Sequence, residues 1–266
     1  MKMIRTNMFP GGKRRALTLS YDDGMESDIR LLEILNQYGI KGTFNLNYNN
    51  LGKKYYVKKE AVKELYYGHE IALHTLNHIF PTQIPDCALR NEILTDKGSL
   101  ELLCEYPVRG MAYPFGDFSE HVITMAGCCD IEYGRTVFST ERFNIPEDFM
   151  KWSPTAHHRE NIKELWQEFM QREFAEQELF YLWGHSFEFD RENNWNVIEE
   201  FCKLAGNRDD IWYATNIQIK EYSEAVKNLR FSANGNYIYN PSFTDVWISV
   251  ESEPVCIPGG KLLKMN

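Results

Sequence analysis

Two adjacent carboxylates and three histidines give this 266-residue chain the side chains of a hydrolytic metal site. His74 and His78 stand four residues apart, so both imidazoles can reach one metal ion when they share a helical turn. A carboxylate from Asp22 or Asp23 would complete a set of three protein ligands. Such a set leaves open positions for water and substrate, which is typical of catalytic metals. His185, much later in the chain, could protonate a leaving group.

The two aspartates can hold different roles because neighbouring residues point in different directions. One carboxylate can bind the metal while the other acts as a general base on the water that the metal binds. Each motif is weak when taken alone. Asp-Asp-Gly after a strand is often only a turn, and His-x-x-x-His is more often surface or capping chemistry. Their positions in the expected fold are what favour a metal site.

Hydrophobic periodicity predicts the elements that position these residues. Strands are expected at 16–21, 41–46, 70–74, 108–113, 131–136, 179–183 and 211–214. Helices are expected at 28–38, 58–67, 88–105 (with an interruption at Gly98), 119–126, 161–175, 194–204 and 217–229. Strands that alternate with helices in this way predict right-handed βαβ units and a parallel sheet. Seven or eight units in about 215 residues favour a distorted, TIM-like (β/α)7-8 barrel.

The candidate residues follow the ends of four different expected strands. Asp22-Asp23 ends the first strand, His74 the third, Tyr113 the fourth, and Gly184-His185 the strand near residue 180. The reacting groups of a β/α barrel sit just past the C-terminal ends of its strands. The sequence therefore predicts that all of them meet at one rim.

We expect residues 1–228 to form the barrel and residues 229–266 to form a small antiparallel β extension packed on it. Asn234-Gly235 before Tyr237 predicts a hairpin with a type I′ turn, and 245–250 alternates with period two. A segment of roughly 38 residues is too small to fold alone.

Composition excludes several classes of partner. The chain has 29 Lys+Arg against 38 Asp+Glu, a formal charge of −9, which argues against a surface for nucleic acid or anionic membranes. It lacks an apolar run of transmembrane length and a secretory signal, so we expect a cytoplasmic protein without membrane insertion. The six cysteines include no C-x-x-C pair and are expected to be free thiols.

Four segments together resemble the motifs of a known family. They are Thr18–Gly24 with its Asp-Asp-Gly end, His74–His78, Ala112–Gly116 and Leu182–His185. These look like the motifs of the polysaccharide deacetylases, which are carbohydrate esterase family 4 with its nodulation-protein-B (NodB) homology domain. The resemblance spans roughly residues 14 to 222 in the family's order. It implies hydrolysis of an N-acetyl (or O-acetyl) group on a sugar or oligosaccharide substrate.

The resemblance also implies roles for individual residues. Asp23, His74 and His78 would bind one divalent metal ion, usually Zn²⁺, with Co²⁺, Ni²⁺ or Mn²⁺ as alternatives. Asp22 would be the general base that activates the metal-bound water, and His185 the acid that protonates the departing amine.

Further residues would contact the substrate. The Phe115 N–H would donate to the oxyanion, and Leu182 and Trp152 would line the pocket for the acetyl methyl group. Tyr113 and His157 complete the predicted substrate contacts, whereas Trp183 is expected to be core and Glu188 to be structural or solvated.

The chain departs from the family pattern in its third motif. That motif usually carries an arginine that holds the base aspartate, and Ala112 stands there instead. Arg109 lies three residues earlier on the same expected strand, so it faces the opposite side. We expect Tyr113 or a charge from another loop to orient Asp22. Gly184 also stands where an aliphatic residue is usual in the fifth motif.

Two alternatives remain open. A hydrolase of the same barrel type could act on a small, non-polymeric amide. A degenerate barrel could bind glycan through its aromatic residues and C-terminal strands without catalysis; the five intact site residues argue against this reading.

Overall fold

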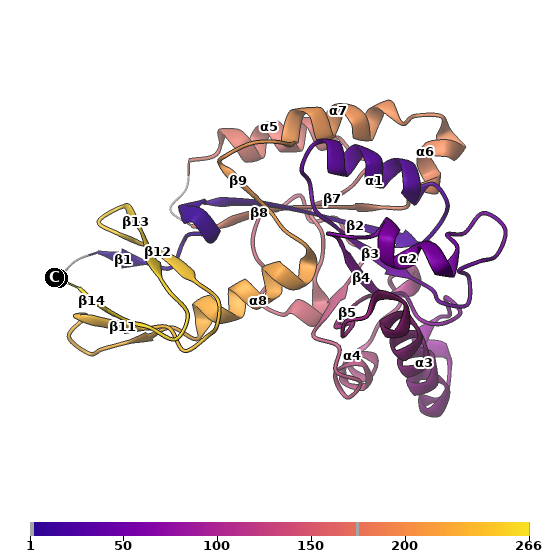
Figure 1. Ribbon diagram of the computed structural model, residues 1–266, viewed down its shortest axis with the longest axis horizontal. Coiled ribbons are helices and arrows are strands. Elements are labelled where there is room, and N and C mark those ends of the chain that lie inside the picture. The colour runs from indigo at the N-terminus through magenta and orange to yellow at the C-terminus, as the bar shows by residue number, and fades with distance from the viewer. Residues whose placement is uncertain (1–2, 174–175, 266) are drawn as a thin grey trace.

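The computed structural model of the chain describes residues 3–173 and 176–265, and its centre is a curled parallel sheet (Figure 1). The order of hydrogen-bonded strands is β6-β5-β4-β3-β2-β8-β7, with β9 pairing the first half of β2. Their bounds are β2 (Arg15–Asp23), β3 (Gly42–Leu46), β4 (Glu70–Leu73), β5 (Gly110–Ala112), β6 (Tyr133–Arg135), β7 (Ala156–His157), β8 (Glu178–Gly184) and β9 (Ile211–Tyr213). The predicted parallel β/α architecture is confirmed.

One short segment joins β6 and β8 of this sheet. Trp152 N–H donates to the Gly134 carbonyl on β6, and Thr155 N–H donates to the Tyr181 carbonyl on β8. Residues 152–155 therefore connect β6, the first strand of the order, with β8, which is next to the last. Because the barrel is closed between β6 and β8 by this short segment and not by a full strand, its shape is distorted.

Helices cover the outside of the sheet, with α1, α5, α6 and α7 along one side and α3, α4 and α8 along the other (Figure 1). Their bounds are α1 (Asp28–Gln37), α2 (Val62–Leu65), α3 (Asp86–Cys104), α4 (Glu120–Gly127), α5 (Ile162–Gln171), α6 (Phe187–Glu192), α7 (Asn196–Ala205) and α8 (Asn216–Lys227). Short 3-10 turns lie at Pro10–Gly12, Lys59–Ala61, Pro81–Gln83, Pro114–Gly116 and Phe149–Lys151.

Three helix predictions need comment. Gly98 does not interrupt α3, because a single glycine lowers helix stability by only about 1 kcal/mol. The helix expected at 58–67 is shorter, formed by a 3-10 turn and the single turn of α2. The helix expected at 161–175 ends at Gln171, and the last two residues of that prediction lie outside the described residues.

Alternation along β2 decides which side chains enter the barrel. Leu17, Leu19 and Tyr21 belong to the large core cluster that β2 shares with the covering helices. The side chains of the alternate residues lie inside the barrel. There the Thr18 hydroxyl donates to the Asn216 side chain of α8, and Ser20, two residues later, accepts from the Asn45 amide of β3. The same period carries Asp22 into the interior at the C-terminal end of the strand.

The C-terminal residues form two small antiparallel sheets beside the end of α8. One is β1-β12-β13, with β1 (Ile4–Arg5), β12 (Val246–Val250) and β13 (Glu253–Ile257); the other is β10-β11-β14, with β10 (Arg230–Phe231), β11 (Tyr237–Tyr239) and β14 (Leu262–Lys264). N-terminal strand β1 thus pairs with the C-terminal β12. Ile238, Val246, Ile248 and Ile257 form a common core with the end of α8.

The predicted type I′ turn of the hairpin is wrong. A type I′ turn needs positive φ at both central residues, and only Gly235 of the Asn234-Gly235 pair has it. Ser232 N–H donates to the Tyr237 carbonyl, so the loop between these paired residues contains four residues rather than two.

Among the described residues, no helix is long and apolar enough to cross a membrane. All six cysteines are free, as expected.

Candidate metal centre and catalytic site

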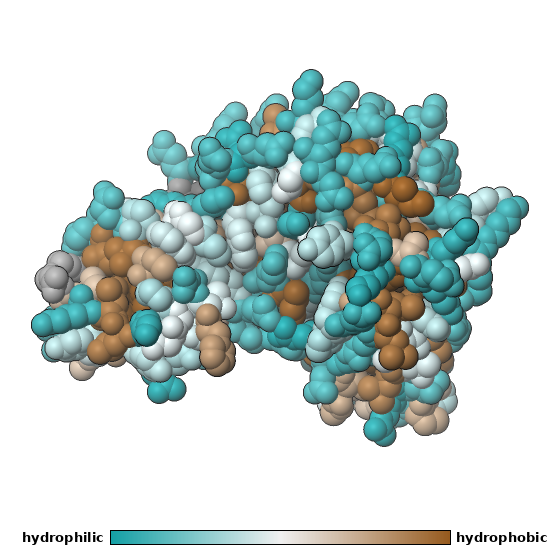
Figure 2. Space-filling model, viewed as in Figure 1, coloured by the Kyte–Doolittle hydropathy of each residue, from teal (hydrophilic) through white to brown (hydrophobic). Residues whose placement is uncertain are grey.

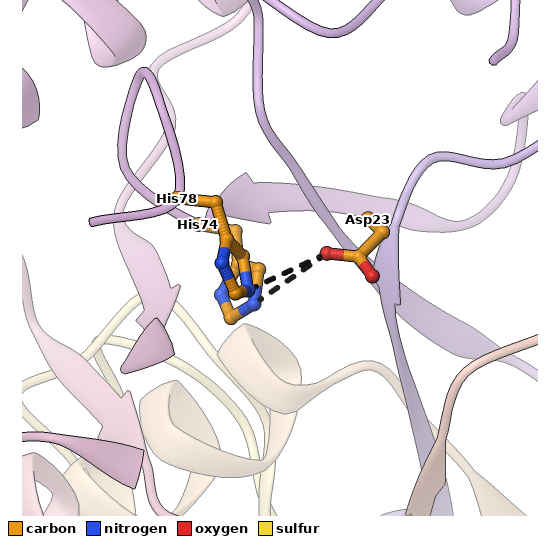
Figure 3. Close-up of side chains that lie close together, drawn as sticks. All are labelled: Asp23, His74 and His78. Atoms are coloured by element: carbon orange, nitrogen blue, oxygen red, sulfur yellow. Dashed lines mark ion pairs between the residues drawn. The ribbon is translucent and has the colours of Figure 1, made fainter. Parts of the chain in front are cut away.

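Asp23, His74 and His78 point toward one another at the C-terminal ends of β2 and β4 (Figure 3). One carboxylate oxygen of Asp23 lies 3.8 Å from His74 Nε2 and 3.7 Å from His78 Nε2. The three ligand atoms lie within 4.8 Å of one another. Two imidazole nitrogens and one carboxylate oxygen are a donor set that suits Zn²⁺ and similar ions. The three residues predicted as ligands are therefore brought together.

The tautomer of His74 favours metal binding. Its Nδ1 lies 2.8 Å from the Ala112 carbonyl, which can only accept, so Nδ1 carries the proton and Nε2 keeps a free lone pair. Burial lowers the pKa of His74 to about 4, although the nearby charges of Asp22 and Asp23 oppose that shift. His74 is therefore neutral at pH 7, which is the form that binds a metal.

The loop that carries the two histidines is held from outside. The Asn47 side-chain amide donates to the carbonyls of both His74 and Thr75, and Glu92 accepts from the backbone and side chain of Asn77. These contacts fix the loop independently of any ion, so the site is organised in advance.

Four residues around this centre have left-handed backbone conformations. The φ angles are +81° for Asp23, +59° for Thr75, +53° for His78 and +58° for Phe115. A non-glycine residue held in this region costs on the order of 1–3 kcal/mol, and such residues gather at functional sites. The strain at the ends of three different strands supports the assignment of this rim as the site.

Arg135 supplies the positive charge that Ala112 lacks. Its guanidinium bonds one oxygen of Asp22, and both side chains are almost completely buried. Ala112 and Arg135 are direct partners across the β5–β6 ladder, so the arginine occupies the same level of the barrel, one strand further along. The residue that orients Asp22 is therefore Arg135 at the end of β6, and not Tyr113 or a loop residue as expected.

Asp22 is held as a carboxylate from several sides. Burial alone would raise its pKa, but Arg135, His74 and His185 outweigh burial and lower the pKa to about 2. Asn45 donates a second hydrogen bond to its other oxygen at 2.8 Å. The His185 Nε2 atom lies 3.9 Å from Asp22, so the candidate base and acid face each other beside the metal ligands.

Glu188, which sequence reasoning left as structural or solvated, lies behind His185. Its buried carboxylate is 3.6 Å from His185 Nδ1, 2.9 Å from His158 Nε2 and 2.6 Å from the Arg159 guanidinium. Burial opposes charge on His185, but the nearby Glu188 carboxylate and the charges of the two aspartates prevail and raise its pKa. A histidine that keeps its proton is suited to act as an acid.

His157, His185 and Glu188 form a second group close enough to hold a metal. The hydrogen bonds argue against that use. Arg159 N–H donates to His157 Nδ1, so Nε2 of this ring carries the proton and points it toward Glu188, 3.3 Å away. We interpret this group as an electrostatic support for the acid.

Residue 184 must be a glycine because the His158 ring occupies the space beside it. A Cβ atom there would lie 2.1 Å from His158 Nδ1. His158 is buried between Tyr21 and Phe189 and needs that space to reach Glu188. The departure from the usual aliphatic residue therefore accompanies the carboxylate support of His185.

The structure corrects three predicted substrate contacts. Tyr113 is buried and donates its hydroxyl to the Met150 carbonyl, away from Asp22. Trp152 packs among Tyr133, Phe149 and Tyr181 as a core residue. Leu182 pairs with Leu19 on the helix-facing side of the sheet, because the strand period of two turns it outward.

Trp183, which was expected to be core, faces the site instead. The Arg135 guanidinium lies 4.4 Å from the centre of its ring, and the His157 ring meets it edge-on at 4.5 Å. Trp183 stands two residues before His185 and shares its side of the chain. It is the candidate wall for the acyl group in place of Leu182.

Phe115 remains at the rim of the metal centre. Its ring is half-exposed, stacks on Phe80 at 3.9 Å and meets the edge of the His78 ring at 4.4 Å. The predicted role of its N–H as an oxyanion donor stays a prediction.

Comparison with known proteins finds similarity over part of the chain. Residues 10–134 match the family described as polysaccharide deacetylase. Ninety-six residues are 30% identical to a peptidoglycan-N-acetylglucosamine deacetylase of Bacillus cereus, covering 35% of this chain and 44% of that relative. The chain is similar to the polysaccharide deacetylase family over residues 10–134, which are just under half of its length. It spans less than half the length of the curated relatives it matches.

Two solved structures show the same fold. A Mycobacterium smegmatis protein assigned to the polysaccharide deacetylases aligns with a TM-score of 0.63 at 18% identity, over 85% of this chain and 96% of that one. The Puue allantoinase aligns with a TM-score of 0.62 at 12% identity, over 80% and 91% of the two chains. These likenesses confirm the distorted barrel.

Removal of one imidazole tests the metal ligands. We expect His78→Ala to lose roughly one bound metal ion per chain, because three protein ligands become two. Metal content after purification, measured by mass spectrometry, checks this. His121→Ala is the control, since His121 is exposed and pairs only with Asp86 among the described residues. Equal metal content in both variants would exclude His78 as a ligand.

The effect of Glu188 on the pKa of His185 can be tested from the pH dependence of the rate. A carboxylate stabilises the imidazolium, so Glu188→Gln should lower the pKa of His185 and move the basic limb of the rate profile to lower pH. Glu192→Gln is the matched control because Glu192 pairs with the same arginines, Arg159 and Arg191. A basic limb that stays in place in Glu188→Gln would show that Glu188 does not act on the acid.

Proposed function

We propose that this chain is a metal-dependent hydrolase that removes the acetyl group from an acetylated amino group of a carbohydrate. The observation that carries the proposal is the convergence at one rim of three metal ligands, a buried carboxylate base and a histidine acid. The similarity of residues 10–134 to the polysaccharide deacetylase family supports the acetylated carbohydrate as substrate.

Asp23, His74 and His78 would hold the metal ion, and Zn²⁺ best fits two imidazoles and a carboxylate. When bound, such an ion polarises an acyl oxygen and lowers the pKa of water. Asp22 lies beside these ligands and is ionised at neutral pH, so it accepts a proton from the attacking water. Arg135 keeps the carboxylate in the ionised form and in place.

His185 acts on the other side of the reacting group. Its Nε2 faces Asp22 and its Nδ1 faces Glu188, so the ring is oriented with one nitrogen toward the substrate. Protonation of the departing nitrogen by His185 makes the amine a good leaving group and yields the free amino sugar and acetate. Trp183 beside Arg135 would limit the space for the acyl group to a small methyl.

The substrate class is tested by acetate release. We expect release from N-acetylglucosamine oligosaccharides, with a rate that exceeds that on small non-polymeric amides. Comparison of kcat/KM across an oligosaccharide, the N-acetylglucosamine monosaccharide and a small amide measures this preference. A higher kcat/KM on the small amide would support the alternative substrate and contradict the carbohydrate assignment.

A further inference from the structure

One face of the sheet β10-β11-β14 has no partner among the described residues. Residues that are directly opposite in antiparallel strands share a face. Arg230, Tyr239 and Leu262 are opposite one another and form one row across the three strands. Tyr237 is opposite Lys264 and begins the second row. We call these five residues the outer face.

The outer face is exposed, whereas the reverse of the same sheet is buried at its centre and exposed only at its edge, where Phe231 is 47% exposed. Tyr237 is 40%, Tyr239 38% and Leu262 61% exposed, whereas Ile238 between the tyrosines is fully buried in the core of the extension. Within the described part of the chain, neither tyrosine ring packs on another ring. Figure 2 shows hydrophobic and hydrophilic residues side by side on the surface of the extension. Exposed aromatic groups of this kind mark interaction sites.

The charge of the outer face is opposite to that of the chain. It carries Arg230 and Lys264 and no carboxylate, although the whole chain has a formal charge of −9. A local positive field on an acidic protein favours a negatively charged ligand.

The tyrosines add a requirement on shape. Residues two apart on a strand lie about 7 Å apart, so the two tyrosine side chains project side by side from one face of the sheet. Tyrosine combines an apolar face with a polar hydroxyl, which suits the mixed surface of a sugar ring. We propose that the outer face binds a polysaccharide that carries carboxylates, with the tyrosines under the rings and Arg230 and Lys264 on the charges.

The position of the outer face separates this binding from catalysis. The extension joins the barrel at the start of β2, where Tyr222 of α8 donates its hydroxyl to the Met8 carbonyl and accepts the Trp247 N–H of β12. The metal ligands lie at the opposite end of β2 (Figure 1). A chain bound to the outer face would therefore hold the protein on a polymer without entering the catalytic site.

Binding of the full chain to polygalacturonate, with dextran as the uncharged control, tests the proposal by isothermal titration calorimetry. We expect polygalacturonate to bind more tightly than dextran and to weaken as salt rises. The double variant Tyr237→Ala, Tyr239→Ala should weaken binding at least about tenfold, because aromatic side chains dominate such contacts. Arg230→Glu with Lys264→Glu should abolish it.

Matched controls use exposed residues of the barrel. Tyr67→Ala replaces an 82% exposed tyrosine, and Lys58→Glu with Arg90→Glu makes the same change of charge far from the extension. Unchanged binding in the outer-face variants would overturn the proposal, as would equal binding of dextran. Equal affinity for single-stranded DNA would also overturn it, because charge alone would then explain binding. No arm depends on turnover, so the outcome is independent of the proposed activity.

Discussion

Asp22→Asn is expected to lower kcat by roughly 10²–10⁴-fold, the usual contribution of a general base, while the metal content stays unchanged. Asparagine has the shape of aspartate and can keep a hydrogen bond to Asn45, but it cannot accept the proton of the attacking water. Asp22 is not one of the three predicted ligands, so the metal should remain. Acetate release and metal content, measured on the same preparation, check both parts.

The neighbouring residue provides the matched control. Asp23→Asn makes the same chemical change one residue later, at a predicted ligand, and should lower metal content together with activity. An Asp22→Asn variant with full activity would exclude Asp22 as the base. Loss of metal in Asp22→Asn with retention in Asp23→Asn would show that the two aspartates have exchanged roles.

Arg135→Ala is expected to have the second largest effect. The change leaves the Asp22 carboxylate buried without its main counter-charge, and breaking a buried pair in this way typically destabilises a protein by about 3–5 kcal/mol. In the wild type the pKa of Asp22 is about 2, so its carboxylate is ionised, and its stabilising effect present, until pH falls through that value. Without Arg135, burial should raise the pKa of Asp22. The acidic limb of the kcat profile should therefore move to higher pH.

Moving the arginine from position 135 to position 112 distinguishes an electrostatic effect on Asp22 from a general loss of stability. Ala112 and Arg135 are opposite each other on adjacent strands, so an arginine at position 112 reaches the same level of the barrel. We expect Ala112→Arg in the Arg135→Ala background to restore part of kcat and to return the acidic limb toward its original pH. An acidic limb that does not move in Arg135→Ala would contradict the role of Arg135, whatever the loss of stability.

The convergence of the proposed metal ligands, base and acid could be predicted from the sequence because each follows the end of a hydrophobic strand. Asp23, His74 and His78 lie in short motifs whose spacing is itself chemical information. Barrel topology then brings these motifs to one rim without any knowledge of side-chain contacts. Most strands of the parallel sheet were predicted for the same reason, since they are short apolar runs, whereas the two-residue β7 was not predicted.

Arg135 could not be found in this way. It ends a short strand with no motif around it, and its relation to Asp22 depends on the register of β5 against β6. Sequence reasoning recognised the gap at Ala112 but had no means to see which residue lies opposite. Glu188 was missed for a similar reason, because α6 was not predicted and its contact with His185 spans one turn of that helix.

Leu182 and Trp183 were assigned the wrong way round although the sequence contained the signal. Side chains alternate between the faces of a strand, so the residue two positions before His185 shares its side, and that residue is Trp183. A count by two from His185 would have placed Trp183 at the site and Leu182 among the helices.

The most direct test of the central claim is the metal dependence of acetate release by the purified chain. Treatment with a chelator should abolish release from N-acetylglucosamine oligosaccharides, and one equivalent of Zn²⁺ or Co²⁺ should restore it. Metal analysis of the restored protein should find roughly one ion per chain. Full activity in the metal-free protein, or no activity after an ion is bound, would contradict the assignment of this site as a metal-dependent deacetylase.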